Sequence, residues 1–345
     1  MTRARTMLIV AALAAATLVV VAVFAPRLAA AGWLLAFTYV AAFPLGSLAL
    51  LMIHRLTGGR WGDTLEPILR PLALTTPLLV LLIIPVLVTA PILFPWPHGA
   101  NGEITHSVRL IYLNVPSYAA RSLFALAGWS VLAFILPDAK TRAAPFIAGI
   151  GLVFYGIAIN FVGLDWVLAA EPLFFSTSFG ASLAFTQILA ALALAAMVAP
   201  RGGSLPDLGA LLLVVMLGIT YTDFMAVLVM WYGDVPSKVL WFVERVREPW
   251  LALAVAAFVT ASLVPIALLM FARMRKSRVA LRFIGACSLV GLAFYQTWLL
   301  APAFGSATIV PALLAFVVMA ALIAAKVNGG WLQDLCYRWS AAHGR

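Results

Sequence analysis

The chain has 345 residues and a net charge of +10, and 65% of its residues are hydrophobic while only 10% are charged. Because a soluble domain has about 25% charged residues, this composition excludes a water-soluble fold. The basic residues lie in loops between apolar segments, so the charge indicates membrane topology rather than nucleic-acid binding. Two cysteines, Cys287 and Cys336, support neither a disulfide framework nor an iron–sulfur cluster.

Apolar segments of about 20 residues, the length that a helix needs to cross the hydrocarbon core, recur along the whole chain. The first follows Arg3 and Arg5 as a signal peptide would, but it is longer than a typical signal core, so we take it as a span. We predict an all-α polytopic membrane protein that forms one integral membrane domain, residues 1–345. About ten spans are expected at residues 7–25, 32–54, 72–95, 118–137, 144–164, 174–199, 206–232, 249–272, 279–303 and 307–327.

Lysine and arginine are distributed unequally between the two sides of this arrangement. With ten spans, 16 of them fall on the side of both termini and 6 on the other side, and the strongest contribution is the loop Arg273–Arg282. Because positively charged loops stay in the cytoplasm, both termini are predicted to be cytoplasmic. Two long outer connections, 96–117 and 233–248, carry aromatic and proline residues and are expected to lie along the membrane interface. Residues 56–71 form a comparable cytoplasmic connection.

Two segments resemble each other, residues 37–51 (FTYVAAFPLGSLALL) and 175–189 (FSTSFGASLAFTQIL). The second lies four spans after the first, so the repeats would be parallel. This pattern predicts two four-helix bundles, 32–164 and 174–303, flanked by the peripheral spans 7–25 and 307–327. Small residues are common in any membrane helix, so chance similarity is the alternative.

Ionisable groups inside a span are rare and are functional candidates by default. Asp223, with Tyr221 beside it in the seventh span, is the clearest proton or ion site, although a structural carboxyl is the alternative. Arg121 either extends to the interface or pairs with Asp165 or Glu171.

Histidine is too scarce for a transmembrane haem, which typically needs two facing histidines. Only His54 touches a span, because His98 and His106 lie in an outer loop and His343 lies in the tail. His54 itself is either a point where protons enter or a solvated interfacial residue. We therefore expect no cofactor in this chain, and any electrons would travel through partner subunits or a quinone.

Three motifs carry a resemblance to a known family. They are Asp165-Trp-x₄-Glu171-Pro-x₃-Ser-Thr, Trp231-Tyr-Gly-Asp-x-Pro236, and His54-x-Leu-Thr-Gly-Gly-x-Trp-Gly62. Their order and sides resemble the F-type integral membrane subunit of alternative complex III, a bacterial quinol:cytochrome c oxidoreductase. That subunit belongs to the NrfD-like superfamily of polysulfide-reductase anchors, whose fold has two four-helix bundles and two further helices.

The resemblance implies a subunit of a respiratory complex in the bacterial inner membrane. Its partners would be a sister NrfD-like membrane subunit, an iron–sulfur protein and a multihaem cytochrome c, which would hold the quinone, the haem c and the iron–sulfur clusters. It also implies a proton pathway through His54, Asp165 and Glu171. The last two carboxylates would share a proton at the outer exit if they lie together, or would cap the sixth span instead.

One departure from the family pattern affects the seventh span. The family has a polar Ser-Gln pair where this chain has Met225-Ala226, so either Asp223 replaces the polar relay or the path is broken. A secondary transporter that uses Asp223 is the alternative function. No span carries a histidine cluster, a Ser/Lys dyad or metal-ligand spacing, so an intramembrane enzyme is disfavoured.

Overall fold

The computed structural model describes residues 2–98, 111–136, 141–172, 174, 176–198, 204–233 and 236–328. Throughout these residues the regular secondary structure is helical, without a strand. Nine helices of this part of the chain are long and apolar enough to cross a bilayer, and Leu8–Phe24 forms a shorter apolar helix. The prediction of an all-α polytopic membrane protein is confirmed. The orientation of the termini stays a prediction.

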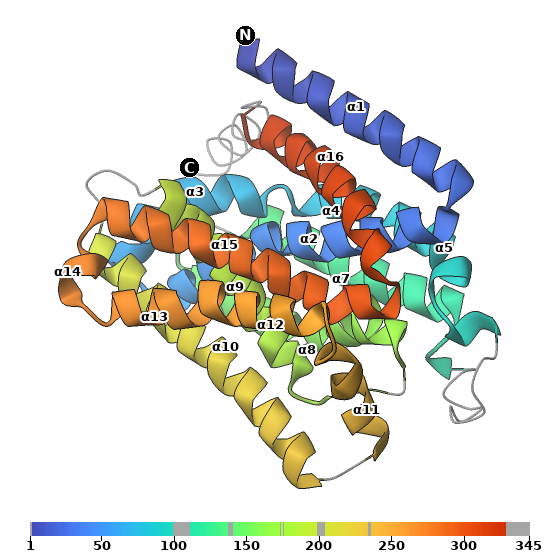
Figure 1. Ribbon diagram of the computed structural model, residues 1–345. Coiled ribbons are helices and arrows are strands. Elements are labelled where there is room, and N and C mark those ends of the chain that lie inside the picture. The colour runs from blue at the N-terminus through green and yellow to red at the C-terminus, as the bar shows by residue number, and fades with distance from the viewer. Residues whose placement is uncertain are drawn as a thin grey trace.

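Helix α2 (Pro26–Thr57) runs through the middle of the molecule, as Figure 1 shows. Its most apolar stretch of 18 residues is 89% buried. The helices α3 (Arg60–Ala73), α8 (Ala144–Trp166), α9 (Phe179–Val198) and α16 (Ile309–Asn328) all pack against it. Helix α1 (Thr2–Phe24) lies outside this core and packs against α16 and α2. Helix α2 ends at Gly58 and Gly59, whose φ angles of 67° and 100° favour glycine.

After α2 the chain turns back along it as three consecutive helices. These helices are α3 (Arg60–Ala73), α4 (Thr76–Leu82) and α5 (Ile84–Leu93). Residues 56–71, expected to be a connection, therefore contain a helix. The apolar side chains of Leu65 and Leu69, one helical turn apart, are buried in the core beside α2.

The bend between α3 and α4 is compatible with a membrane because its backbone is satisfied locally. Pro77 has no N–H and cannot donate to the carbonyl of Ala73. The hydroxyl of Thr76 donates to that carbonyl instead, at 2.6 Å. Such a substitute matters because an unpaired carbonyl is costly in hydrocarbon.

The other long helices complete two groups, which we call the first and second helix groups. The first consists of α2, α3 to α5, α7 (Val115–Ile135) and α8 (Ala144–Trp166). The second consists of α9 (Phe179–Val198), α10 (Leu205–Gly233), the run of α12 (Trp250–Phe258), η3 (Val259–Leu263) and α13 (Val264–Leu269), and α15 (Arg278–Leu300). Within the second group α9 contacts α10 and α15, and α15 contacts α12.

The two groups meet where α2 crosses α9. A Cβ atom on Gly46 would lie 1.9 Å from the carbonyl oxygen of Gln187, so this close approach requires glycine. The side chain of Gln187 also accepts a hydrogen bond of 2.7 Å from the hydroxyl of Tyr155 on α8. Because Gly46 and Gln187 belong to the two similar sequence segments, those segments lie against each other in the fold.

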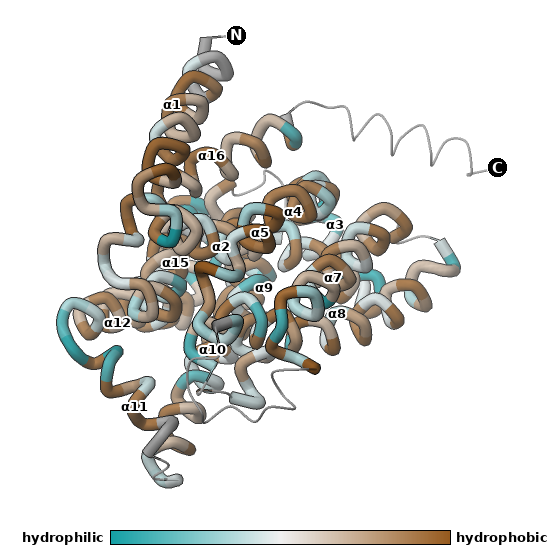
Figure 2. Tube along the Cα trace, turned by 90° about the vertical axis from the view of Figure 1, so that its right-hand side faces the viewer, coloured by the Kyte–Doolittle hydropathy of each residue, from teal (hydrophilic) through white to brown (hydrophobic). Residues whose placement is uncertain are grey.

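Helix α11 (Pro236–Arg245) connects the far end of α10 to α12 (Figure 1). The outer connection 233–248 therefore contains a helix, and Figure 2 shows a hydrophilic stretch between α11 and α12. We call this side of the molecule the α11 end. The opposite side, which carries the short helix α14 (Ala272–Arg275), is the α14 end.

Candidate functional site

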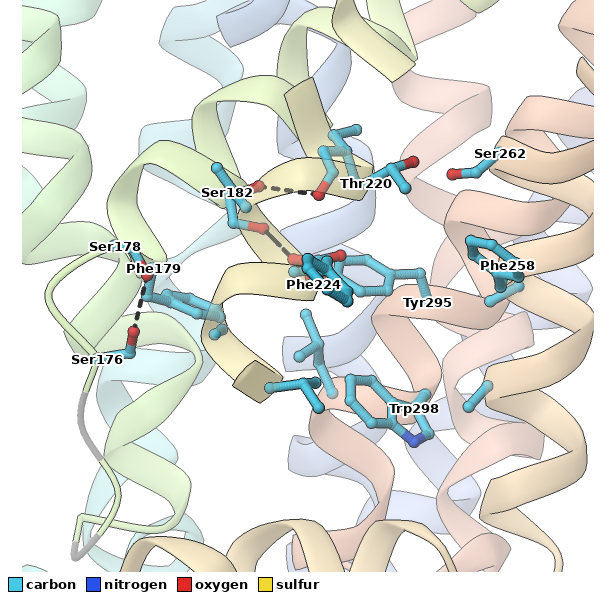
Figure 3. A pocket seen from close by; sticks show the side chains of 18 of the residues that line it. Ser176, Ser178, Phe179, Ser182, Thr220, Phe224, Phe258, Ser262, Tyr295 and Trp298 are labelled. Atoms are coloured by element: carbon cyan, nitrogen blue, oxygen red, sulfur yellow. Dashed lines mark hydrogen bonds between the residues drawn. The ribbon is translucent and has the colours of Figure 1, made fainter. Parts of the chain in front are cut away.

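The second helix group encloses a cavity of about 430 Å³, within the usual range for small-molecule sites. Its walls come from α9 to α12, η3 and α15, and most of the lining residues are apolar. Aromatic rings gather toward the α11 end, where Phe174 stacks on Trp241 with ring centres 4.2 Å apart. Figure 3 shows Trp298 on this side of the cavity and Ser262 on the other side.

Asp223 on α10 supplies the carboxylate of this cavity. Ser182 on α9 donates a hydrogen bond of 2.7 Å to its Oδ1 atom, and the hydroxyl of Tyr295 on α15 donates to the same oxygen at 3.1 Å. Three helices therefore converge on one carboxylate oxygen. The other oxygen, Oδ2, receives neither of these two bonds.

Serine and threonine residues line the cavity around Asp223. Ser176 and Ser178, whose hydroxyl oxygens lie 3.0 Å apart, line the cavity ahead of Ser182 (Figure 3). On the α14 side of Asp223 the lining includes the hydroxyl residues Thr220 and Ser262 beside apolar ones such as Ile219 (Figure 3). Hydroxyl groups therefore line the cavity on both sides of the carboxylate, and those of Ser176 and Ser178 lie toward the α11 end.

The π-helix η3 forms part of the cavity wall. Pro265 has no N–H and cannot close the normal helical hydrogen bond to the carbonyl of Ala261, which explains the local departure from α-helical spacing. Ala261 and Ser262 line the cavity from this segment. Helix α15 approaches it closely, since a Cβ atom on Gly291 would lie 2.5 Å from the nitrogen of Ala261. Such π segments often occur at functional sites.

Tyr221, predicted as part of the proton site, does not belong to it. The residue is 64% exposed and is not among the residues that line the cavity. Two positions along a helix differ by about 200° in direction, so Tyr221 and Asp223 face different sides. The hydroxyls near Asp223 are instead those of Ser182 and Tyr295.

Asp165 is bound by Arg121 rather than by a second carboxylate. The guanidinium donates from Nε and Nη2 to the two carboxylate oxygens, both at 2.8 Å, and Asp165 is buried. Of the alternatives for Arg121, pairing with Asp165 is confirmed. The guanidinium also lies 3.7 Å from the ring centre of Tyr112, whose pKa is raised mainly by burial.

Glu171 is bound by a different arginine, Arg245 on α11. Arg245 donates to both oxygens of Glu171, to the carbonyl of Leu299 at 2.9 Å and to the carbonyl of Trp241 at 3.1 Å. Burial lowers the pKa of Arg245, and Glu171 opposes that change. Because Asp165 and Glu171 each bind their own arginine, the expectation of a proton shared between them is corrected to two separate ion pairs.

His54 is a buried residue that holds the turn after α2. Its Nδ1 atom accepts from Arg55 at 3.0 Å, and its Nε2 atom then carries the proton that bonds the Gly59 carbonyl at 3.1 Å. Asp63 and Glu66 lie near enough to share an ion with His54, but Arg55 binds Glu66 at 2.5 Å and repels a cation. These contacts support a structural role instead of proton uptake. His106 and His343 lie outside the described residues.

Ser182 is the site residue that sequence reasoning missed. It lies in the Gly-x-Ser-Leu-Ala part of the repeat, three residues into α9, where a small residue is ordinary in a membrane helix. Tyr295 is a neutral polar residue within the predicted span 279–303. A single sequence shows that such groups exist, but it does not show that Ser182 and Tyr295 turn toward Asp223.

Comparison with known proteins does not place the chain in a family. No family model matches the sequence, and no curated protein matches it. The resemblance to the F-type subunit of alternative complex III therefore rests on the three motifs. In this structure Asp165, Glu171 and His54, the ionisable residues of two of these motifs, form structural contacts.

Proposed function

We propose that the chain is a cofactor-free integral membrane subunit of a quinol-oxidising electron-transfer complex, in which Asp223 exchanges protons with the outer side. The observation that carries the proposal is the carboxylate of Asp223, held by Ser182 and Tyr295 inside the second helix group. A carboxylate inside a span is costly, so its retention in a cavity favours a role in moving protons.

The position of Asp223 supports exchange with the outer side. Asp223 is ten residues from Gly233 at the α11 end of α10, about 15 Å along the helix, and eighteen residues from Leu205 at its other end, about 27 Å. The serines lead to the α11 end, which the charge bias places outside. In this proposal Asp223 takes the place of the polar pair that the family motif has at Met225 and Ala226.

Arginines on α7 and α11 support the anchoring part of the proposal. Arg121 and Arg245 hold the connections at the α11 end against the helix groups, which gives this surface a defined shape. The sister membrane subunit, the iron–sulfur protein and the multihaem cytochrome c, with their quinone, haem c and iron–sulfur clusters, would assemble on this anchor. A bacterial inner membrane with cytoplasmic termini follows from the same proposal.

Purification from native membranes tests the complex. A tagged chain should co-purify with proteins that carry c-type haem and iron–sulfur clusters, detected by absorption spectroscopy and mass spectrometry. In vesicles that contain the complex, Asp223→Asn should lower the number of protons released per quinol oxidised, while Asp207→Asn on the same helix should leave it unchanged. If the chain purifies without redox partners, the proposed function is wrong.

A secondary transporter is the second candidate, and the cavity of about 430 Å³ beside the carboxylate favours it. A proton-coupled transporter would bind its substrate there and release the proton of Asp223. Proteoliposomes that contain only this chain should then accumulate substrate when a proton gradient is applied. Asp223→Asn should abolish uptake, and uptake by the isolated chain would favour this candidate over the complex.

A further inference from the structure

Asp165 and Glu171 have two kinds of neighbour in common, an arginine and an aromatic ring over which that arginine lies. For Asp165 these neighbours are Arg121 and Tyr112, and the guanidinium carbon lies 3.7 Å from the ring centre. For Glu171 the guanidinium carbon of its arginine lies 3.6 Å from the ring centre of Trp241. Each carboxylate is therefore compensated by a cation that an aromatic face also holds.

Asp223 has aromatic neighbours too, but it has no cation among the described residues. It is the only charged residue of those that line the cavity, and none of the ion pairs in the described part of the chain includes it. Ser182 and Tyr295 bind it through hydroxyl groups, which are neutral. Arg245 does not line the cavity, and Glu171 compensates its charge. Because a carboxylate in apolar surroundings is costly without a positive partner, the cavity favours a ligand that brings one.

The walls of the cavity indicate what kind of cation fits. Phe224, Phe258, Tyr295 and Trp298 all line it (Figure 3). The ring centres of Tyr295 and Trp298 lie 6.1 Å apart. The face of an aromatic ring attracts cations, and that of tryptophan does so most strongly. A hard metal ion needs several oxygen ligands, whereas these walls are mainly carbon. The lining therefore suits an organic cation with apolar substituents.

We propose that this cavity binds a lipophilic organic cation, an ammonium or phosphonium ion with apolar substituents, whose charge pairs with Asp223. The substituents contact the aromatic walls, and the cation fills the role that an arginine has beside Asp165 and beside Glu171. The volume of about 430 Å³ is within the range for molecules of drug size. The inference rests on the cavity alone, so it applies whether or not the chain has redox partners. For the transporter candidate, it names the class of substrate.

Binding to the isolated chain tests the inference. The full chain is placed in phosphatidylcholine nanodiscs, and binding of tritiated methyltriphenylphosphonium is measured, with empty nanodiscs as the blank for partition into lipid. We expect saturable binding at a single site per chain. Triphenylphosphine oxide has an oxygen in place of the methyl group, so it has nearly the same shape but no net charge. It should compete about tenfold less well or worse.

Two variants test the charge and the space of the site separately. Asp223→Asn keeps the shape of the side chain but removes its charge, and it should weaken binding about tenfold or more. Asp207→Asn removes the same charge from an exposed position of the same helix, outside the lining, and should leave binding unchanged. Ala254→Phe fills the cavity from α12 and should weaken binding as strongly as Asp223→Asn, whereas Ala252→Phe, exposed on that helix and outside the lining, should not.

Several outcomes would overturn the inference. They are the absence of saturable binding, equal competition by the phosphine oxide, and normal affinity in folded Asp223→Asn or folded Ala254→Phe. The melting temperature of each variant in nanodiscs shows whether it is folded. If one variant does not fold, the other variant and the phosphine oxide still decide the question. Co-purification with redox proteins has no bearing on these measurements, so the inference and the proposed function fail independently.

Discussion

The two helix groups each contain an aspartate within the helices, and they hold it in different ways. In the first group both carboxylate oxygens of Asp165 accept hydrogen bonds from Arg121. The central helix α2 of this group is 89% buried over its most apolar 18 residues. In the second group Asp223 lines a cavity and accepts hydrogen bonds from two hydroxyl groups. Only 22% of the most apolar 18 residues of α10 are buried. The comparison teaches that the first group is a scaffold, while the second contains the space in which chemistry can occur.

The strongest test of the scaffold is Arg121→Ala. Removing one partner of a buried ion pair leaves Asp165 as an uncompensated charge, which costs about 3–5 kcal/mol. The variant should therefore unfold at a much lower temperature or denaturant concentration in detergent. The double replacement Arg121→Met with Asp165→Leu should recover part of the loss, and a double variant no better than the single one would contradict this account.

Gly46→Ala should produce the next largest loss, because the added methyl group would collide with the backbone of α9. The obstructing atom is the carbonyl oxygen of Gln187, which cannot turn aside as a side chain would. We expect a loss of about 3 kcal/mol, at the upper end of overpacking effects. Gly149→Ala on α8 is the matched control, since its Cβ meets no atom within 4 Å and should not be destabilising. Equal behaviour of the two variants would disprove the close contact.

Arg245→Ala should loosen the α11 end with a smaller effect on the whole fold. The variant loses the hydrogen bonds to Glu171 and to the carbonyl of Leu299, which costs about 1–2 kcal/mol. Hydrogen exchange measured by mass spectrometry should become faster over residues 236–245. Arg247→Ala, exposed two residues further on, should leave that exchange unchanged. Unchanged exchange in Arg245→Ala would show that α11 is held by other contacts.

Asp223→Asn should have the smallest effect on stability, within about 0.5 kcal/mol. The Oδ1 atom of the amide can still accept from Ser182 and Tyr295, and no cation in the cavity loses a partner. Asp165→Asn, by contrast, should be strongly destabilising because it leaves Arg121 unpaired. If thermal unfolding shows equal losses for the two asparagine variants, Asp223 is a structural carboxyl and the contrast between the groups is lost.

The spans could be predicted from the sequence because hydrophobicity is a local property of each segment. Helix α3 was missed because Arg60, Asp63 and Arg70 give residues 56–71 the polarity of a connection, although Leu65 and Leu69 carry a helical repeat. Helix α3 has the alternating apolar and polar faces of an amphipathic helix. Its sequence looks polar in comparison with the long apolar spans on either side, so it was taken for a connection.

The candidate site was only partly predictable, because a site depends on how each helix is rotated. Asp223 stood out as a charge within a span, and it lies in the cavity. Tyr221 was chosen for its closeness in sequence and faces away, while Ser182 and Tyr295 come from helices 41 and 72 residues distant. Arg121 and Asp165 are 44 residues apart, so their pairing was one alternative among several until the helices were placed.

The contact at Gly46 also limits how this protein can move. Many membrane proteins work by rocking one bundle against another, and such a hinge needs an interface that can slide or separate. Here the backbone of α9 lies directly against that of α2 at Gly46, with no side chain between them. Helices α16, α8 and α3 also pack against α2. Sliding of the two halves past each other would have to break this contact. Motion during a working cycle is instead expected in α10 and in residues 250–269, because only 22% of the apolar stretch of each is buried.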